Sequence, residues 1–265
     1  SFRNADLTSI YAVLINITLH AVSDPTTFFI PVCNILEICM GQPTTRGSAA
    51  FYDVDGTLIK TNVVHAYAFY ALHAPKISDR IGRTASLLAS LPLYWAADKY
   101  DRKWFNDAFY KNYAGFSEDR LIVLGHELFE NVIRPNIFPG ARDLIKRSQD
   151  QGHKQVLVTG ALDFATQPLA EYFGMDDFVA NRLEFKDGIA TGQLRKPMLA
   201  GANKALWFRR YAEEHNLDLD RSFAYADSGS DLPLLSVVGN PCAINPDFRL
   251  RTTAKAYQWP ILNLD

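Results

Sequence analysis

The chain has few cysteines and no strong charge of either sign, and both features exclude broad classes of protein. It contains three cysteines in 265 residues and no Cys-x-x-Cys pair, which argues against a secreted disulfide framework and against a zinc site. The net charge of −2 gives no electrostatic reason to expect nucleic acid as a partner. Internal repeats and low-complexity segments are absent too. The composition therefore indicates a globular chain with ample apolar residues for a core.

Long apolar runs are also scarce. Residues 7–23 and 25–36 carry no Asp, Glu, Lys or Arg, but neither run is convincingly long enough to span a bilayer, and no signal peptide is expected. Residues 1–48 are predicted to form two amphipathic helices and a linker. Three alternatives remain open for residues 1–40: packing on the domain or on a dimer partner, docking on a membrane surface, or belonging to an upstream domain.

The most informative motif is a short apolar run that ends in two carboxylates. Residues 49–54 read as a buried strand, and Asp53 and Asp55 stand at its end, before a Gly56-Thr57 turn. Ligands usually bind at the carboxyl ends of strands in an open α/β sheet. There, one carboxylate can attack a phosphorus atom while its neighbour transfers a proton. The alternative is a surface turn with two solvated aspartates.

A second motif repeats the pattern of a strand followed by a polar turn. Residues 155–158 form the expected strand, and Thr159 and Gly160 form the turn. Residues 164–173 then predict a helix, with Pro168 near its first turn. Because a helix N-terminus beside a strand end presents free backbone N–H groups, this place suits an anion.

Two further motifs follow in the chain. Lys204 stands at the start of a helical run over residues 205–214. Residues 223–226 predict another strand, followed by Asp227 and, four positions on, by Asp231, so that both carboxylates can face one centre. Considered one at a time, Lys204 would be interpreted as a solvent-exposed lysine and Asp227 as a helix N-cap.

In this order, the four motifs resemble those of the haloacid dehalogenase (HAD) superfamily, in its phosphoserine-phosphatase-like branch, subfamily IB. The resemblance covers residues 49–264. It implies an α/β fold: a three-layer, Rossmann-like parallel sheet with an inserted helical cap of the C1 type. The expected core comprises residues 49–61 and 136–265, and the expected cap comprises residues 62–135.

The spacing of the motifs agrees with such an insertion. Asp53 and Thr159 lie 106 residues apart, far more than one crossover helix needs. Between them the sequence predicts helices over residues 63–74, 77–100, 102–113 and 117–133. Pro92 is expected to kink or split the second of these helices. Later in the chain, Asp187-Gly188 between alternating residues predicts a β-hairpin.

The resemblance also implies a role for each catalytic residue. Asp53 is then the nucleophile that becomes an aspartyl-phosphate, and Asp55 is the general acid that later activates water. Thr159, the Gly160 amide and Lys204 hold the phosphate. Such chemistry requires positive charge, because an anionic nucleophile and an anionic phosphate otherwise repel each other.

The same resemblance implies that Mg²⁺ is the cofactor. Asp53, the backbone carbonyl of Asp55 and Asp227 are the expected ligands, and Asp231 is expected in the surrounding shell. These oxygen ligands suit a hard divalent cation, which can also polarise a phosphoryl group.

The sequence departs from the family pattern at two places. Ala226 precedes Asp227 where the family usually has glycine. Asn62 stands where phosphoserine phosphatases carry a glutamate that binds the substrate ammonium. Asn62 is therefore a candidate substrate contact. Because Asn62 lacks the negative charge of that glutamate, phosphoserine is a weak candidate substrate. The run over residues 84–97, which carries no charged side chain, is compatible with a lipid-like or amphipathic phosphate as the substrate.

The sequence thus predicts a Mg²⁺-dependent phosphatase of a small or amphipathic phosphomonoester, either cytoplasmic or bound peripherally to a membrane. Its expected partner is a small-molecule phosphate ester and not a nucleic acid. Two alternatives remain: a catalytically silent HAD interaction module, and a phosphotransferase or HAD part of a phospholipid-pathway protein.

Overall fold

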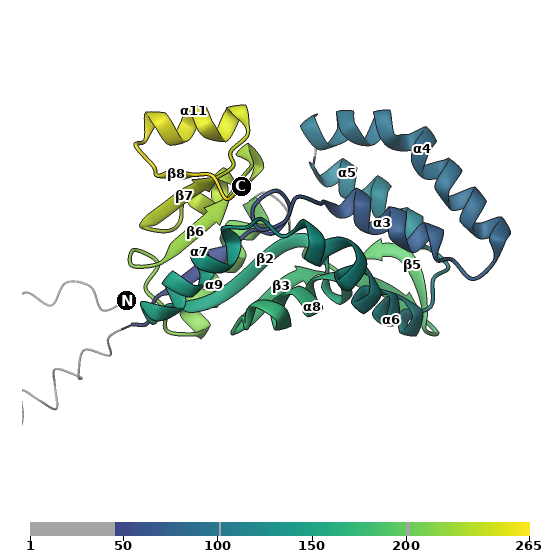
Figure 1. Ribbon diagram of the computed structural model, residues 1–265, viewed down its shortest axis with the longest axis horizontal. Helices are drawn as coiled ribbons and strands as arrows, with labels where there is room; N and C mark the ends of the chain where they lie inside the picture. The colour runs from purple at the N-terminus through teal and green to yellow at the C-terminus, as the bar shows by residue number, and fades with distance from the viewer. Residues whose placement is uncertain (1–45, 101, 200–201) are drawn as a thin grey trace, which may run out of the picture. The chain divides into compact units, whose positions relative to one another are not determined.

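A computed structural model describes residues 46–100, 102–199 and 202–265 of the chain (Figure 1). Residues 46–265 form one compact unit. The helices predicted within residues 1–40, and the membrane or dimer contact proposed for them, lie outside the described residues. At the end of the predicted linker, Gly47 is already joined to the unit, because its N–H donates to the Asn216 carbonyl at 3.1 Å.

A six-stranded parallel sheet forms the centre of this unit, in the order β3-β2-β1-β6-β7-β8. The chain fills the sheet outward from β1, first on one side and then on the other. β1 therefore lies beside the point where the strand order reverses, which is where open α/β sheets bind ligands. The strands are β1 (Ala49–Tyr52), β2 (Lys154–Leu162), β3 (Asp177–Asn181), β6 (Phe223–Ala226), β7 (Asn240–Ile244) and β8 (Ile261–Leu262).

Helices cover both faces of the sheet, which explains why all four residues of β1 are buried. Ala50 and Tyr52 belong to one apolar core, and Ala49 and Phe51 belong to the other. Helices α7 (Ala141–Asp150) and α8 (Asp163–Phe173) contribute to the first core. Helices α9 (Ala202–Glu214), α10 (Leu232–Leu235) and α11 (Phe248–Ala256) contribute to the second. The predicted three-layer α/β fold is confirmed.

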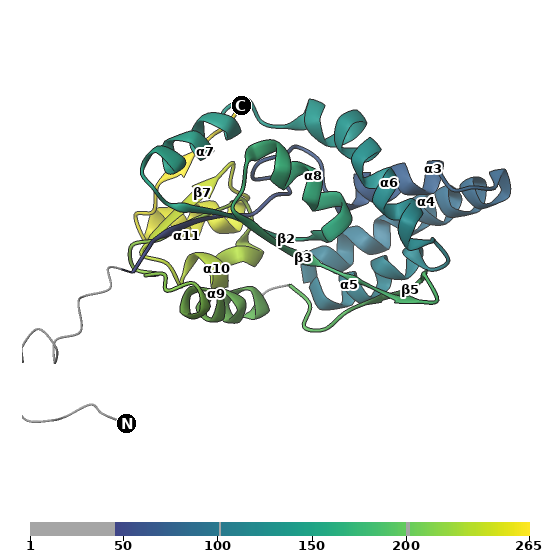
Figure 2. The same cartoon turned by 90° about the horizontal axis from the view of Figure 1, so that it is seen from below.

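The connection between β1 and β2 is a helical insertion, as the motif spacing predicts. Figures 1 and 2 show its helices α3, α4, α5 and α6 gathered together, away from β7, β8 and α11. The insertion consists of α3 (Val63–Leu72), α4 (Ile77–Tyr100), α5 (Arg102–Phe109), the 3₁₀ turn Tyr110–Tyr113, α6 (Glu118–Leu128) and the π-helical turn Phe129–Ile133. The 3₁₀ turn Arg134–Asn136 then leads toward α7. The treatment of residues 62–135 as a separate domain stays a prediction.

Pro92 lies inside α4, so of the two predicted outcomes, a kink or a split, the split does not occur. Proline removes the hydrogen bond to the carbonyl four residues earlier, here that of Leu88. Leu88 is 61% exposed and Pro92 is exposed as well, so water can reach the released carbonyl. The helix therefore continues through the proline on its solvent side.

Close packing between α6 and α8 joins the insertion to the layers around the sheet. A Cβ atom on Gly125 of α6 would lie 2.2 Å from the carbonyl oxygen of Phe164 in α8. That carbonyl has no helical donor, because Pro168 stands four residues later. α8 begins one residue before the predicted start, which places Pro168 at the start of its second turn. Glycine and proline together allow the two helices to approach.

A β-hairpin also contacts the insertion. β4 (Leu183–Lys186) pairs with β5 (Ile189–Leu194), and the two residues between them have positive φ angles, 51° at Asp187 and 74° at Gly188. These angles confirm the predicted hairpin turn. Ala190 in β5 exchanges backbone hydrogen bonds with Gly115 and Phe116, after the 3₁₀ turn of the insertion. Within the described residues, no helix is long and apolar enough to cross a membrane.

Candidate functional site

The carboxylates of the first motif lie at the carboxyl end of β1. The Asp53 N–H donates to the Tyr225 carbonyl at 2.9 Å, so the residue continues the pairing of β1 with β6. Its side chain is almost fully buried, whereas Asp55 is partly exposed. Directly after Asp55 and before the next helix, Gly56 turns the chain with a φ of 81°. A Cβ atom there would lie 2.2 Å from an Asp227 oxygen, so only glycine fits without a shift.

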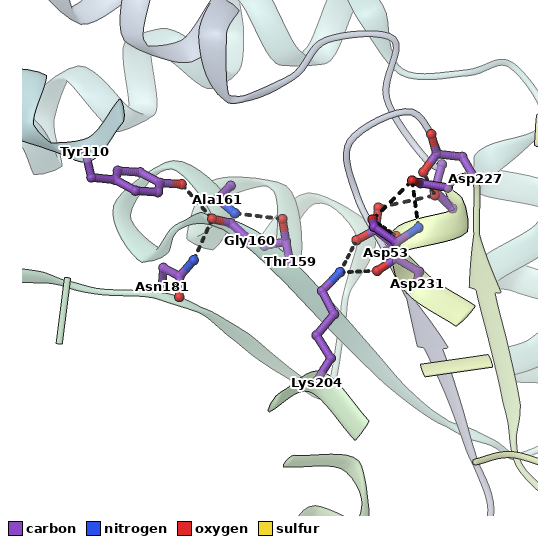
Figure 3. Close-up of polar contacts among 12 residues, drawn as sticks. Asp53, Tyr110, Thr159, Gly160, Ala161, Asn181, Lys204, Asp227 and Asp231 are labelled. Atoms are coloured by element: carbon purple, nitrogen blue, oxygen red, sulfur yellow. Dashed lines mark hydrogen bonds and ion pairs between the residues drawn. The ribbon is translucent and has the colours of Figure 1, made fainter. Parts of the chain in front are cut away.

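Lys204 connects two of the predicted carboxylates. Its ammonium lies 2.8 Å from an Asp53 oxygen and 2.6 Å from an Asp231 oxygen, and all three side chains are at most 8% exposed (Figure 3). Burial alone lowers the pKa of Lys204, but the charges of Asp231 and Asp53 outweigh it, so the pKa rises above the usual value. The lysine is therefore a permanent buried cation, supplied by α9 at a separation of 151 residues from Asp53.

Asp227 completes a cluster of three carboxylates, because ligand oxygens of Asp53, Asp227 and Asp231 lie within 4.8 Å of one another. Burial, together with the charges of Asp53 and Asp231, raises the pKa of Asp227 to about 8. Thr57 donates to both Asp53, at 3.4 Å, and Asp227, at 3.3 Å. Within the described parts of the chain, no lysine or arginine forms an ion pair with Asp227. Three carboxylates and one lysine leave a negative charge that a divalent cation would balance.

The second motif differs from its prediction in one respect. Thr159 and Gly160 lie inside β2, which continues to Leu162, and not in a turn. The register of β2 against β3 shifts between Val158 and Leu162, so the strand becomes irregular where the sequence indicates its end. Thr159 is buried, and its hydroxyl oxygen accepts the Ala161 N–H at 3.0 Å.

The orientation of Gly160 is fixed from two directions. Its carbonyl accepts a hydrogen bond from the Tyr110 hydroxyl at 2.6 Å and from the Asn181 amide at 2.8 Å (Figure 3). Tyr110 belongs to the insertion and Asn181 to β3, so this peptide connects the insertion to the sheet. Asn181 also accepts the Leu199 N–H at 2.8 Å, which holds the segment before α9 in place.

One cavity of about 670 Å³ joins the four motifs to the insertion. It is lined by every residue predicted for the site: Asp53, Asp55, Asn62, Thr159, Gly160, Lys204, Asp227 and Asp231. The insertion contributes Leu91, Tyr94, Phe105 and Asn106 to the wall, and the start of α3 contributes Val63, Val64 and His65. The volume is that of a site for a small organic ligand.

Asn62 lies at the edge of this cavity, but its carbonyl oxygen is already engaged. It caps α3 by accepting the N–H groups of Val64, at 3.0 Å, and His65, at 3.4 Å. The His65 imidazole lies a further 2.9 Å from the same oxygen. The amide oxygen of Asn62 is thus a helix N-cap acceptor, and these hydrogen bonds compete with any contact to a substrate.

Sequence reasoning missed four residues that the structure places in or beside the site. Thr57 stands within the first motif, so its position could have indicated a role. Tyr110, Asn181 and Asn106 belong to no motif, and their contacts depend on how the insertion and β3 fold toward β2. The helical run over residues 102–109 mixes charged and aromatic residues, so no local pattern distinguishes Asn106.

A family model described as haloacid dehalogenase-like hydrolase matches residues 50–236. This chain belongs to the haloacid dehalogenase-like hydrolase family. A phosphoserine phosphatase of Mycobacterium tuberculosis is 33% identical over 221 residues, which is 83% of this chain and 71% of that protein. A histidinol-phosphatase of Neisseria meningitidis is 28% identical over 227 residues, covering 81% of this chain and 97% of that protein.

Solved structures agree with this membership. The crystal structure of a Bordetella pertussis protein of unknown function superimposes with a TM-score of 0.72 at 26% identity, covering 83% of this chain and all of that one. The enzyme class predicted from the sequence, a phosphoric monoester hydrolase, is consistent with the family and with the phosphatase names of its relatives.

Proposed function

We propose that the protein is a Mg²⁺-dependent phosphatase that hydrolyses a small or amphipathic phosphomonoester through an aspartyl-phosphate on Asp53. One observation carries the proposal: the buried Lys204 ammonium joins Asp53 and Asp231 beside a third carboxylate, Asp227, at the carboxyl ends of β1 and β6. This arrangement provides a nucleophile, a fixed cation and an unbalanced acidic group around a single cavity. The small phosphate esters in the names of the relatives support the substrate class.

The donor set fits magnesium. The ligand atoms are carboxylate oxygens, which hard divalent cations prefer. Burial and the neighbouring like charges raise the pKa of Asp227. Asp53, Asp227 and the backbone carbonyl of Asp55 would hold the ion. When bound, Mg²⁺ would neutralise charge between nucleophile and phosphate and polarise the phosphoryl oxygens. Asp231 would orient Lys204 from the opposite side.

The first half of the reaction transfers the phosphoryl group to the protein. An Asp53 carboxylate oxygen attacks phosphorus, forming one P–O bond while the bond to the alcohol oxygen breaks. Asp55, at the cavity and only partly buried, gives its proton to the departing alcohol. Lys204, Thr159 and the Gly160 N–H stabilise the phosphoryl oxygens.

The second half returns Asp53 to its starting state. A water molecule attacks the phosphorus of the aspartyl-phosphate, and Asp55 accepts the proton of that water. The bond between phosphorus and the Asp53 oxygen breaks, which releases inorganic phosphate and the free carboxylate. Asp55 is then protonated again for the next turnover.

The helical insertion acts as a cap in this proposal. Its side chains close one side of the cavity, and the Tyr110 hydroxyl holds it against Gly160. Four carboxylates line the cavity, and all of them, Asp53, Asp55, Asp227 and Asp231, come from the sheet side. The described residues of the cap therefore offer no carboxylate to a substrate ammonium there, which supports phosphoserine being a poor substrate.

Phosphate release from an aryl phosphate tests the proposal. Purified protein should release phosphate with Mg²⁺ and lose this activity in excess chelator. Asp53→Asn should abolish turnover, because an amide is a poor nucleophile. Asp150→Asn, at an exposed position at the end of α7, is the matched control and should retain it. Full activity of Asp53→Asn would refute the assignment.

A further inference from the structure

Asn106 is a buried polar residue for which the described part of the chain provides no hydrogen-bond partner. Its side chain lies on α5, is 4% exposed and lines the catalytic cavity. Among the described residues, no backbone or side-chain group forms a hydrogen bond with its amide. The amide is not among the fully buried side-chain atoms that lack a partner, so it stays accessible, and the cavity that Asn106 lines is where a partner can reach it. Because the amide faces a cavity that suits a ligand, the ligand is the natural partner.

The position of Asn106 is fixed on both sides. The preceding Phe105 stacks on Phe109, with ring centroids 5.2 Å apart, and meets the edge of Tyr94 at 6.0 Å. Four residues later, the Tyr110 hydroxyl donates to the Gly160 carbonyl in the phosphate-binding motif. Residues four apart on helical backbone lie on the same side, so Asn106 belongs to the face that meets the catalytic strands.

The surroundings of the amide restrict what it can bind. Leu91, Tyr94 and Phe105 provide an apolar wall beside it. The oxygen of Asn62, the other cap amide at the cavity, already accepts hydrogen bonds from the start of α3. An amide offers one acceptor and two donor hydrogens but no charge, so it matches a hydroxyl, carbonyl or carboxylate better than an ammonium.

We propose that Asn106 determines specificity by hydrogen-bonding an oxygen-bearing group on the alcohol part of the substrate. The apolar remainder of that alcohol lies against Leu91, Tyr94 and Phe105. The substrate class is therefore a phosphate ester of an uncharged or anionic alcohol that combines an apolar body with a hydroxyl, carbonyl or carboxylate group. This inference rests on the proposed phosphatase function and adds the identity of the leaving group.

The experiment compares phenyl phosphate with the three hydroxymethylphenyl phosphates, which share one aryl body and differ in an added hydroxyl. In the wild-type protein, the best hydroxymethyl isomer should exceed phenyl phosphate in kcat/KM by about tenfold or more, because the apolar analogue leaves the amide unpaired. Asn106→Leu removes the hydrogen-bonding group at similar size, so the ratio should fall to about one. No preference in the wild type, or an equal loss for all four esters, would overturn the inference.

A matched control separates recognition from structure. The Asn112 amide bonds within the cap, to the Tyr94 hydroxyl at 2.6 Å and to the Phe109 carbonyl at 2.7 Å. Asn112→Leu should lower the melting temperature and leave the ratio between the esters as in the wild type. Asn106→Asp should shift preference toward aminomethylphenyl phosphate, since a carboxylate can pair with its ammonium.

A binding measurement distinguishes failure of this inference from failure of the proposed function. Calorimetry with benzylphosphonate and its hydroxymethyl derivatives, in the presence of Mg²⁺, requires no turnover. Preference for a hydroxymethyl derivative that disappears in Asn106→Leu supports the inference even if no ester is hydrolysed. Equal affinities in both proteins would refute it, even if phosphatase activity is established.

Discussion

Replacing Asp227 by asparagine should stabilise the metal-free protein, although Asp227 belongs to the proposed active site. Its carboxylate shares a buried cluster with Asp53 and Asp231, while Lys204 pairs with those two and not with Asp227. Burial and the two neighbouring charges raise the pKa of Asp227 to about 8 from the ordinary value of 3.8. An asparagine keeps the shape and removes the ionisable group.

The sign and size follow from proton linkage. The folded protein holds a proton on Asp227 that the unfolded chain releases, so the metal-free protein loses stability as pH rises from about 4 to about 8. At pH 7 the loss is on the order of a few kcal/mol. In a domain of this size, about 1 kcal/mol shifts the melting temperature by about 2–4 °C. We therefore expect Asp227→Asn to melt at least about 4 °C higher than the wild type near pH 7.

Thermal melting in chelator, at about pH 5.5 and about pH 8, measures the effect. The advantage of Asp227→Asn should grow between the two pH values, whereas that of Asp150→Asn, an exposed control, should change little. Added Mg²⁺ should stabilise the wild type and have little effect on Asp227→Asn, because one proposed ligand is lost. A variant that melts below the wild type at the higher pH, or an advantage that does not depend on pH, would refute the reasoning.

Three further predictions concern catalysis. Ca²⁺ in place of Mg²⁺ should inhibit turnover, since calcium prefers more ligands and longer bonds; rates with each ion check this, and equal rates would contradict it. Asp55→Asn should reduce turnover by about 10²–10⁴-fold, with a smaller loss for p-nitrophenyl phosphate, whose leaving group needs little protonation; a uniform loss would argue against a general acid. Gly56→Ala should reduce both Mg²⁺ stabilisation and activity, because a Cβ atom would meet Asp227 at 2.2 Å, and thermal melting with and without the ion measures the former.

The sequence predicts well those elements whose conformation is determined by residues adjacent in the chain. The hairpin turn needs positive φ angles, and Asp187-Gly188 supplies residues that tolerate them. The apolar run over residues 49–52 folds as the buried strand β1, two residues shorter than the predicted strand over residues 49–54. Lys204 is different, because nothing local indicates that it reaches Asp53, 151 residues away. Only the order of the four motifs, read through the family resemblance, indicated that these side chains would meet.

The features that the sequence did not predict depend on tertiary contacts. β2 continues through Thr159 and Gly160 because the Gly160 carbonyl finds partners in Tyr110 and Asn181. α4 continues through Pro92 because that side of the helix faces solvent. Such partners come from distant segments, so residue patterns within a short window cannot show them.

The proposed mechanism requires Asp53 to become phosphorylated during turnover, so the covalent intermediate itself should be trapped. Protein mixed with Mg²⁺ and a phosphate ester should be quenched in acid, digested and analysed by mass spectrometry. We expect a phosphoryl group on the peptide that contains Asp53, absent in Asp53→Asn and absent in excess chelator. A phosphoryl group on any other residue, or turnover that persists in Asp53→Asn, would contradict it.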